Sequence, residues 1–142
     1  MWLFLFVWQR GFCMTKLFLT LASLSGFIAV ALGAFGAHAL KSKLDANMLS
    51  VYQTAVQYQF IHTLALFGIG LLLMRISVAS LALNVSGLAF AVGIIFFSGS
   101  LYGIALGGPR WLGPITPLGG LAFMIGWLSL LWFTYHADTS LI

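Results

Sequence analysis

Four long stretches without a formal charge constrain this chain more than any other feature of its sequence. The first, 17–40, reads LFLTLASLSGFIAVALGAFGAHAL and holds 24 residues. As a helix it would extend about 36 Å at about 1.5 Å per residue, enough to cross a hydrocarbon core about 30 Å thick. Only 6% of the 142 residues are charged, against about 25% in a typical soluble domain. So few charges cannot cover a water-soluble surface, and we therefore predict an integral membrane protein.

The other uncharged stretches lie at about 58–74, 80–106 and 115–135. The break at 75–79 is short, so the second and third spans must be antiparallel neighbours, and GGPRWLGP at 107–114 is a turn by its Gly and Pro content. In the polar stretch 41–57, Ser42 and Asp45 resemble a capping box. We expect an amphipathic helix there that either lies in the interface or leads straight into the second span. The predicted fold is all-α: residues 14–142 form a single domain, an antiparallel bundle of four transmembrane helices.

The N-terminal residues 1–13 allow two interpretations. The apolar run before Gln9 and Arg10 is too short to span a membrane, so it is either an interfacial segment or an extension that precedes the true start at Met14. An A-x-A pattern at 37–39 also resembles a signal-peptidase site. The apolar region before it is longer than in a secretory signal, so we expect the first span to be retained.

The membrane orientation stays open. With the N-terminus inside, three basic residues fall on each side of the membrane, so the positive-inside rule does not choose. These are Arg10, Lys16 and Arg75 on one side, and Lys41, Lys43 and Arg110 on the other.

Small residues recur at four-residue spacing in the first and third spans. Such stripes let another helix approach closely. The positions that we predict to pack helices are Ser25, Ala29, Gly33 and Ala37 in the first span and Gly99 and Gly103 in the third.

Polar side chains from all four spans are expected to meet at one end of the bundle. They are His38, Gln59, His62, Thr63, Ser98, Ser100, Tyr102 and Thr116. One hypothesis is a site for a small molecule, an ion or a proton. Ionisable side chains at membrane depth cost free energy and usually face the bundle interior, and histidine changes its protonation state in the physiological pH range. The other is that these groups hydrogen-bond the helices together, which the lack of an intramembrane carboxylate favours.

No catalytic site, metal site or cofactor is predicted. His38 and His62 could supply two nitrogens, whereas zinc usually takes three or four protein ligands. The Ser98-Gly99-Ser100 segment lacks the strand–turn–helix context and the partner acid of a hydrolase. The basic residues are spread along short polar breaks, which is typical of membrane anchoring and not of nucleic-acid binding.

Four motifs occur in the order of a known family: LGAFGAHAL (32–40), YQFIHTLAL (58–66), FSGSLY (97–102) and TPLGG (116–120). With them the chain resembles the YgdD-like family of small membrane proteins, a domain of unknown function, over about residues 14–135. The resemblance implies four transmembrane helices and a bacterial inner-membrane location. It carries over no catalytic residue and no substrate.

The leading functional prediction is a non-enzymatic accessory or assembly partner in a membrane complex. The small-residue stripes offer more close-packing surface than a four-helix monomer needs, and a homo-oligomer would use the same surface. The alternative is a small carrier or ligand-binding protein that uses the polar end around His38 and His62. An enzyme comes third.

Overall fold

The computed structural model describes residues 2–76 and 80–137, with side chains from residue 13 onward. Every regular element in that part is helical: α1 (Trp2–Phe35), α2 (Ala46–Arg75), α3 (Leu81–Gly93), α4 (Gly99–Ala105) and α5 (Ile115–His136). Two π-helical segments, Gly36–Leu40 and Ile94–Ser98, continue α1 and join α3 to α4, and a short 3-10 turn covers Arg110–Leu112. This confirms the all-α prediction.

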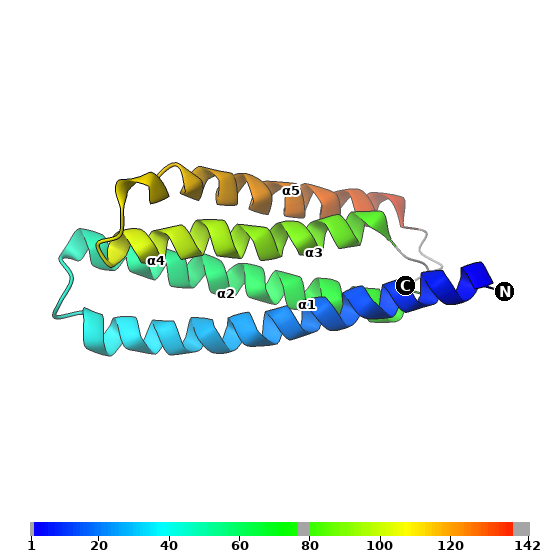
Figure 1. Cartoon of the computed structure of the whole chain (residues 1–142), viewed down its shortest axis with the longest axis horizontal. Coiled ribbons are helices and arrows are strands. Elements are labelled where there is room, and N and C mark those ends of the chain that lie inside the picture. The colour runs from blue at the N-terminus through cyan, green and yellow to red at the C-terminus, as the bar shows by residue number, and fades with distance from the viewer. Residues whose placement is uncertain (1, 77–79, 138–142) are drawn as a thin grey trace.

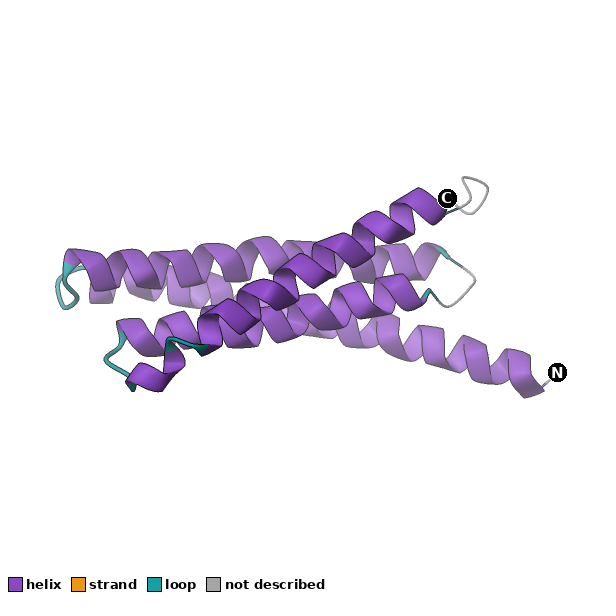
Figure 2. Cartoon of the chain, turned by 90° about the horizontal axis from the view of Figure 1, so that it is seen from above, coloured by secondary structure: helices purple, strands orange, loops and turns teal. Residues whose placement is uncertain are grey.

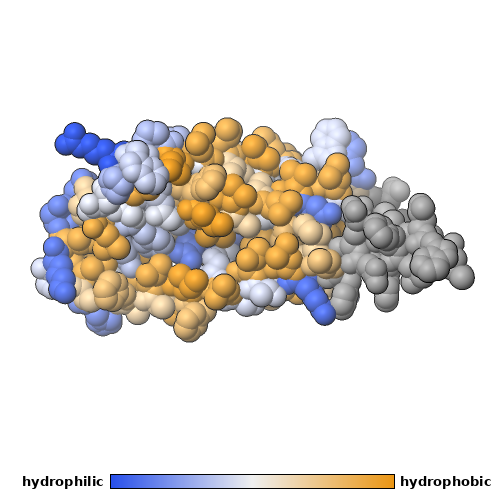
Figure 3. All heavy atoms as spheres, in the orientation of Figure 1, coloured by the Kyte–Doolittle hydropathy of each residue, from blue (hydrophilic) through white to orange (hydrophobic). Residues whose placement is uncertain are grey.

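In the described part of the chain, four helices are long and apolar enough to cross a membrane: Cys13–Leu40, Ala46–Arg75, Leu81–Ala105 and Arg110–His136. Large hydrophobic side chains such as Phe27, Leu81 and Leu128 are exposed on their outer faces, as expected where lipid and not water surrounds a protein. Figure 3 shows hydrophobic residues over most of the visible face, with hydrophilic ones gathered at the end that carries the 41–45 and 107–114 connections. The four-span bundle is therefore confirmed.

The helices form a central pair with one helix on each side. α2 and the α3–α4 unit pack against each other in the centre, α1 packs mainly on α2, and α5 packs on α3 and on the π segment that follows it. In Figure 1, α5 and α1 accordingly lie on opposite sides of the central pair, and in Figure 2 α5 crosses the bundle at a clear angle. As a result, α1 and α5 each leave one side open to their surroundings.

The polar stretch before the second span belongs to α2. The Asp45 carboxylate caps this helix by accepting a hydrogen bond from the Met48 amide at 2.9 Å. The expected capping box, with Ser42 as the cap, is therefore wrong, because the helix begins three residues later at Ala46. Of the two expected placements the structure shows the second: the amphipathic segment leads straight into the span and buries Tyr52 and Ala55.

The third span ends and begins close to its predicted bounds. The Ser80 hydroxyl caps α3 by accepting from the Leu83 amide at 3.3 Å, and Gly107, at a φ of +83°, adopts the left-handed conformation just after the helix. Glycine reaches that conformation without steric cost, which is why it commonly terminates helices. Residues 1–13 continue α1 backward as helix from Trp2, and whether they precede the true start stays a prediction.

The small-residue stripe of the first span packs against α2 at its beginning but not at its end. Ser25, Ala29 and Gly33 lie against α2, whereas Ala37 is exposed. An α-helix turns about 100° per residue, so each four-residue step from Ser25 to Gly33 rotates the stripe by about 40°, and Ala37 lies in the π-helical segment that follows. Ala37 is therefore not part of the packing within the bundle, and its packing against another helix stays a prediction.

In the third span, the space beside Gly103 is filled by the turn that follows the span, and the space beside Gly99 is open, so both stay predictions as contacts for another helix. A Cβ atom added to Gly103 would meet the Leu112 side chain at 2.5 Å, whereas one added to Gly99 would meet nothing within 4 Å. The closest helix approach lies elsewhere, where Gly119 of α5 meets the backbone of Phe97. Only a glycine fits at that contact.

Candidate functional site

A hydrogen-bonded network centred on Gln59 joins three helices. The Gln59 side-chain amide nitrogen donates to the carbonyl oxygen of Ser25 at 3.1 Å and to its hydroxyl at 3.3 Å. The Tyr102 hydroxyl donates to the Gln59 amide oxygen at 2.8 Å, and the hydroxyls of Ser25 and Thr63 lie 2.6 Å apart. Both ends of the Gln59 amide are thus engaged, and the network ties α2 to α1 on one side and to α4 on the other.

Tyr52 extends this network toward the end of the bundle. Its hydroxyl donates to the Leu32 carbonyl at 2.9 Å, and its ring meets the edge of the Tyr102 ring at a centroid distance of 5.0 Å. The closeness of Gly36, where an added Cβ would lie 2.6 Å from the Tyr52 ring, lets this ring enter between the helices. Tyr52 was not among the residues predicted for the polar end, because its position in the polar stretch 41–57 does not show which helix its hydroxyl meets.

His62 is held by partners that define its protonation state. The Trp127 indole donates to His62 Nε2 at 3.2 Å, and His62 Nδ1 lies 2.8 Å from the Tyr58 carbonyl oxygen. Because an indole N–H only donates and a carbonyl only accepts, Nε2 must be unprotonated and Nδ1 must carry the hydrogen. These two bonds therefore define a neutral imidazole.

Aromatic rings enclose His62 as well. Its ring stacks on that of Phe123, with centroids 3.5 Å apart and planes 7° apart, and lies near the rings of Tyr58, Phe90 and Trp127. Trp127 was not among the predicted site residues. A tryptophan at mid-helix gives no sign in the sequence of which distant polar group its N–H will meet.

Ser100 and Thr116 form a separate pair nearer the end of the bundle. Their hydroxyls lie 2.7 Å apart and either can donate to the other. Each hydroxyl also lies within hydrogen-bond distance of a carbonyl of its own chain segment, Phe97 at 3.0 Å for Ser100 and Leu112 at 3.4 Å for Thr116, so one hydroxyl donates across the pair while the other donates to its own carbonyl. The pair joins the beginning of α5 to α4, and within the described residues no hydrogen bond connects it to the Gln59 network.

Two of the predicted residues stay outside these contacts. The His38 side chain is exposed, so the structure does not bring it to His62. Ser98 is buried at 1% exposure, but its hydroxyl has no hydrogen-bond partner among the described residues. Within the same residues, no three His, Cys, Asp or Glu side chains come together as metal ligands would.

The depth of the polar groups differs from the expectation. We expected Gln59, His62 and Thr63 near the beginning of the second span, at one end of the bundle. Because α2 begins at Ala46, Gln59 lies 13 residues inside it, about 20 Å from the start of the helix at about 1.5 Å per residue. The polar groups therefore extend from the end of the bundle at Thr116 to its middle.

Comparison with known proteins gives a family without an assigned activity. Residues 32–120 match the model of a family described as a protein of unknown function, DUF423. A membrane protein of Staphylococcus saprophyticus, UPF0382, is 45% identical over 120 residues, covering 84% of this chain and 98% of the relative. One from Haemophilus influenzae is 42% identical over 127 residues, covering 89% and 99%.

The Escherichia coli inner membrane protein YgdD is 41% identical over 117 residues, covering 82% of this chain and 88% of that protein. The chain belongs to this YgdD-like family. The resemblance drawn from the four motifs is thus confirmed, and with it an uncharacterised, multi-pass inner-membrane protein. No solved structure matches the chain.

Proposed function

We propose that this family member is a non-enzymatic membrane protein that acts by packing α1 against another membrane helix, as an accessory or assembly partner in a membrane complex or in an oligomer of itself. The position of α1 at the edge of the bundle carries this proposal. Only 17% of the most apolar part of this span is buried within the chain, the same share as in the span Arg110–His136, against 39% for α2 and for the span Leu81–Ala105. α1 therefore has a large face available to a partner.

The outer face of α1 is suited to a helix partner. Phe27, Ala31, Ala34 and His38 fall on one side of the helix, opposite the buried Phe18, and all four are exposed. Ala31 and Ala34 are the small members of this face, and small residues allow two helix backbones to approach, which stabilises association where lipid gives no hydrophobic driving force. His38 adds a polar group at the end of this face, available for a hydrogen bond across the contact.

The interior polar groups support a structural role over a catalytic one. Gln59, Thr63 and Tyr102 hydrogen-bond to other groups of the chain, and His62 is engaged at both ring nitrogens. A carrier or enzyme working through these groups would first have to break bonds that join its own helices. This geometry agrees with interhelical bonding, the second of our two hypotheses for the polar residues.

Cysteine crosslinking in intact membranes tests the proposed face. In a Cys13→Ser background, Ala34→Cys should give one defined crosslinked species, either a homodimer or an adduct of one larger polypeptide. Leu121→Cys is the matched control, because it is also exposed and lies six residues inside α5 from the same end of the bundle. Equal crosslinking at both positions, or none at position 34, would contradict the proposal.

Native mass spectrometry of the tagged protein in mild detergent gives a second readout. A stoichiometric second polypeptide, or a dimer that Ala34→Phe disrupts, supports the assembly role. The protein alone with a retained small ligand other than a phospholipid would instead support the carrier alternative.

A further inference from the structure

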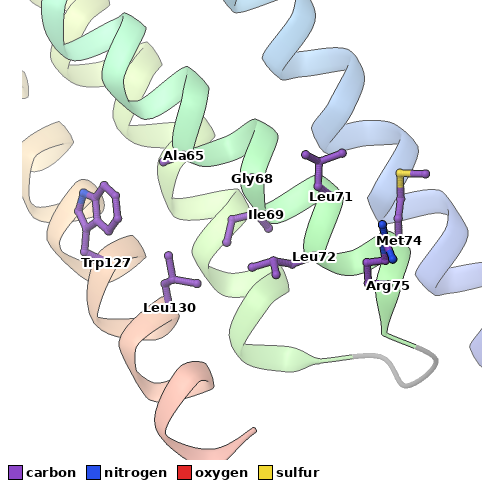
Figure 4. A pocket seen from close by; sticks show the side chains of 9 residues that line it. All are labelled: Ala65, Gly68, Ile69, Leu71, Leu72, Met74, Arg75, Trp127 and Leu130. Atoms are coloured by element: carbon purple, nitrogen blue, oxygen red, sulfur yellow. The ribbon is translucent and has the colours of Figure 1, made fainter. Parts of the chain in front are cut away.

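A cavity of about 620 Å³ opens between the last turns of α2 and the middle of α5. Gly68, Ile69, Leu72 and Arg75 line it from α2, and Trp127 and Leu130 line it from α5 (Figure 4). Its size falls within the range of about 300–1,000 Å³ that is typical of ligand pockets.

The cavity lies where no described side chain fills the space between α2 and α5. Further up the bundle the rings of Tyr58, His62, Phe123 and Trp127 bridge the two helices. Beyond Trp127, α2 offers the small residues Ala65 and Gly68. A Cβ atom added to Gly68 would meet nothing within 4 Å, so the space next to that backbone is open.

The one charged residue that lines the cavity, Arg75, lies at one end of it. Arg75 lies in the last turn of α2 and is exposed, and the other lining residues are apolar apart from the indole N–H of Trp127. That N–H already donates to His62, so Trp127 offers the cavity its ring. Asp45, the one acidic residue in the described part of the chain, caps the opposite end of α2. Within that part, Arg75 therefore has no carboxylate near it.

The length of the cavity matches one leaflet of a bilayer. Ala65 and Arg75 both line it and are separated by about 15 Å along the helix at about 1.5 Å per residue. Half of a hydrocarbon core of about 30 Å is the same length. With Arg75 at the headgroup level, the cavity thus ends near the centre of the membrane, at Trp127.

We propose that this cavity binds one acyl chain of an anionic phospholipid, with the phosphate held by Arg75. A guanidinium forms paired hydrogen bonds with phosphate oxygens, and the apolar wall accommodates the chain. A zwitterionic headgroup would also bring an ammonium group, for which the described residues near Arg75 offer no acidic partner. This lipid site does not depend on the assembly face of α1, and its failure would leave that proposal untouched.

Lipid titration of the delipidated, full-length protein tests the headgroup contact. Phosphatidylglycerol and phosphatidylethanolamine with identical acyl chains are added in detergent, and bound lipid is counted by native mass spectrometry. We expect phosphatidylglycerol to bind about tenfold more tightly, and Arg75→Gln to remove that difference. Arg110→Gln, at the opposite end of the bundle, should keep it. Equal losses in both variants would show non-specific charge attraction and overturn the proposal.

Filling the cavity tests the acyl-chain contact. Gly68→Phe should abolish binding of both lipids, whereas Gly99→Phe should leave it unchanged, because both glycines have open space beside them but only Gly68 lines the cavity. Unchanged binding in Gly68→Phe would place the lipid elsewhere and overturn the proposal. A protein dimer that Gly68→Phe dissociates would also overturn the proposal, since a second chain would then occupy the cavity.

Discussion

Gln59 and His62, two buried polar residues at the middle of α2, are explained by the bonds they make between helices. Gln59 of α2 is buried at 4% exposure and hydrogen-bonds to α1 and to α4. His62 accepts a hydrogen bond from the indole N–H of Trp127 in α5. A polar group in hydrocarbon is costly unless a partner satisfies it. The two histidines of the predicted polar end are therefore not equivalent: His62 is a structural member of the bundle, and His38 is exposed on α1.

We expect His62→Ala to lower the free energy of unfolding by about 2–4 kcal/mol, because it removes a stacked ring, leaves a cavity and strands the Trp127 indole. His38→Ala should change it by less than about 0.5 kcal/mol, as exposed substitutions usually do. Thermal unfolding of both variants in the same detergent measures the difference. Equal losses in the two variants would contradict the assignment of only one histidine to the bundle.

Among the elements, the close approach between α5 and the π segment Ile94–Ser98 is the most demanding contact. Gly119 faces the backbone of Phe97 there. The π segment has a wider turn than an α-helix, so it rotates the faces on which the side chains of α4 lie relative to those of α3. Backbone atoms cannot move aside as the end of a flexible side chain can. The position of α5 along the π segment therefore depends on the absence of a side chain at Gly119.

Gly119→Ala should destabilise the protein by about 1–3 kcal/mol through overpacking. Gly99→Ala is its control within the neighbouring element: it has open space and should be neutral or stabilising by up to about 1 kcal/mol, because alanine favours helix over glycine. Chemical or thermal unfolding in detergent compares them. A neutral Gly119→Ala would show that α5 can shift away from the π segment.

At the scale of the whole molecule, four spans bring both chain ends to one side. α1 begins and α5 ends at the same end of the bundle, opposite the 41–45 and 107–114 connections (Figure 1). The Arg75 end of the lipid cavity lies on the side of the chain ends. The balanced basic residues leave open which side this is.

Labelling with a membrane-impermeant maleimide should separate the two ends. Native Cys13, which is exposed, and Ala137→Cys in a Cys13→Ser background should react from the same side of the membrane. Lys43→Cys and Arg110→Cys, in that background, should react from the other side. Intact and inverted membrane vesicles distinguish the sides and give the orientation. Labelling of Cys13 and Lys43→Cys from one side would contradict the four-span topology.

The packing stripe of the first span shows where sequence reasoning was limited. The four-residue spacing included Ser25, which hydrogen-bonds to α2, and Ala29, which is buried, but it could not tell that Ala37 would be exposed. Gly68 and Trp127 gave no comparable signal, because their importance depends on the distance between α2 and α5. Helix spacing of that kind arises from packing between segments that are far apart in the chain.

By itself the sequence determined that this chain spans the membrane four times as an all-helical bundle, because uncharged stretches of this length have no other stable environment. Its motifs also determined the family. Only the tertiary structure decided which polar groups meet, how deep they lie, and where space remains between helices. Composition and local spacing act along one helix, whereas hydrogen bonds such as Trp127 to His62 and cavities such as that beside Gly68 require the crossing angles and separations of several helices.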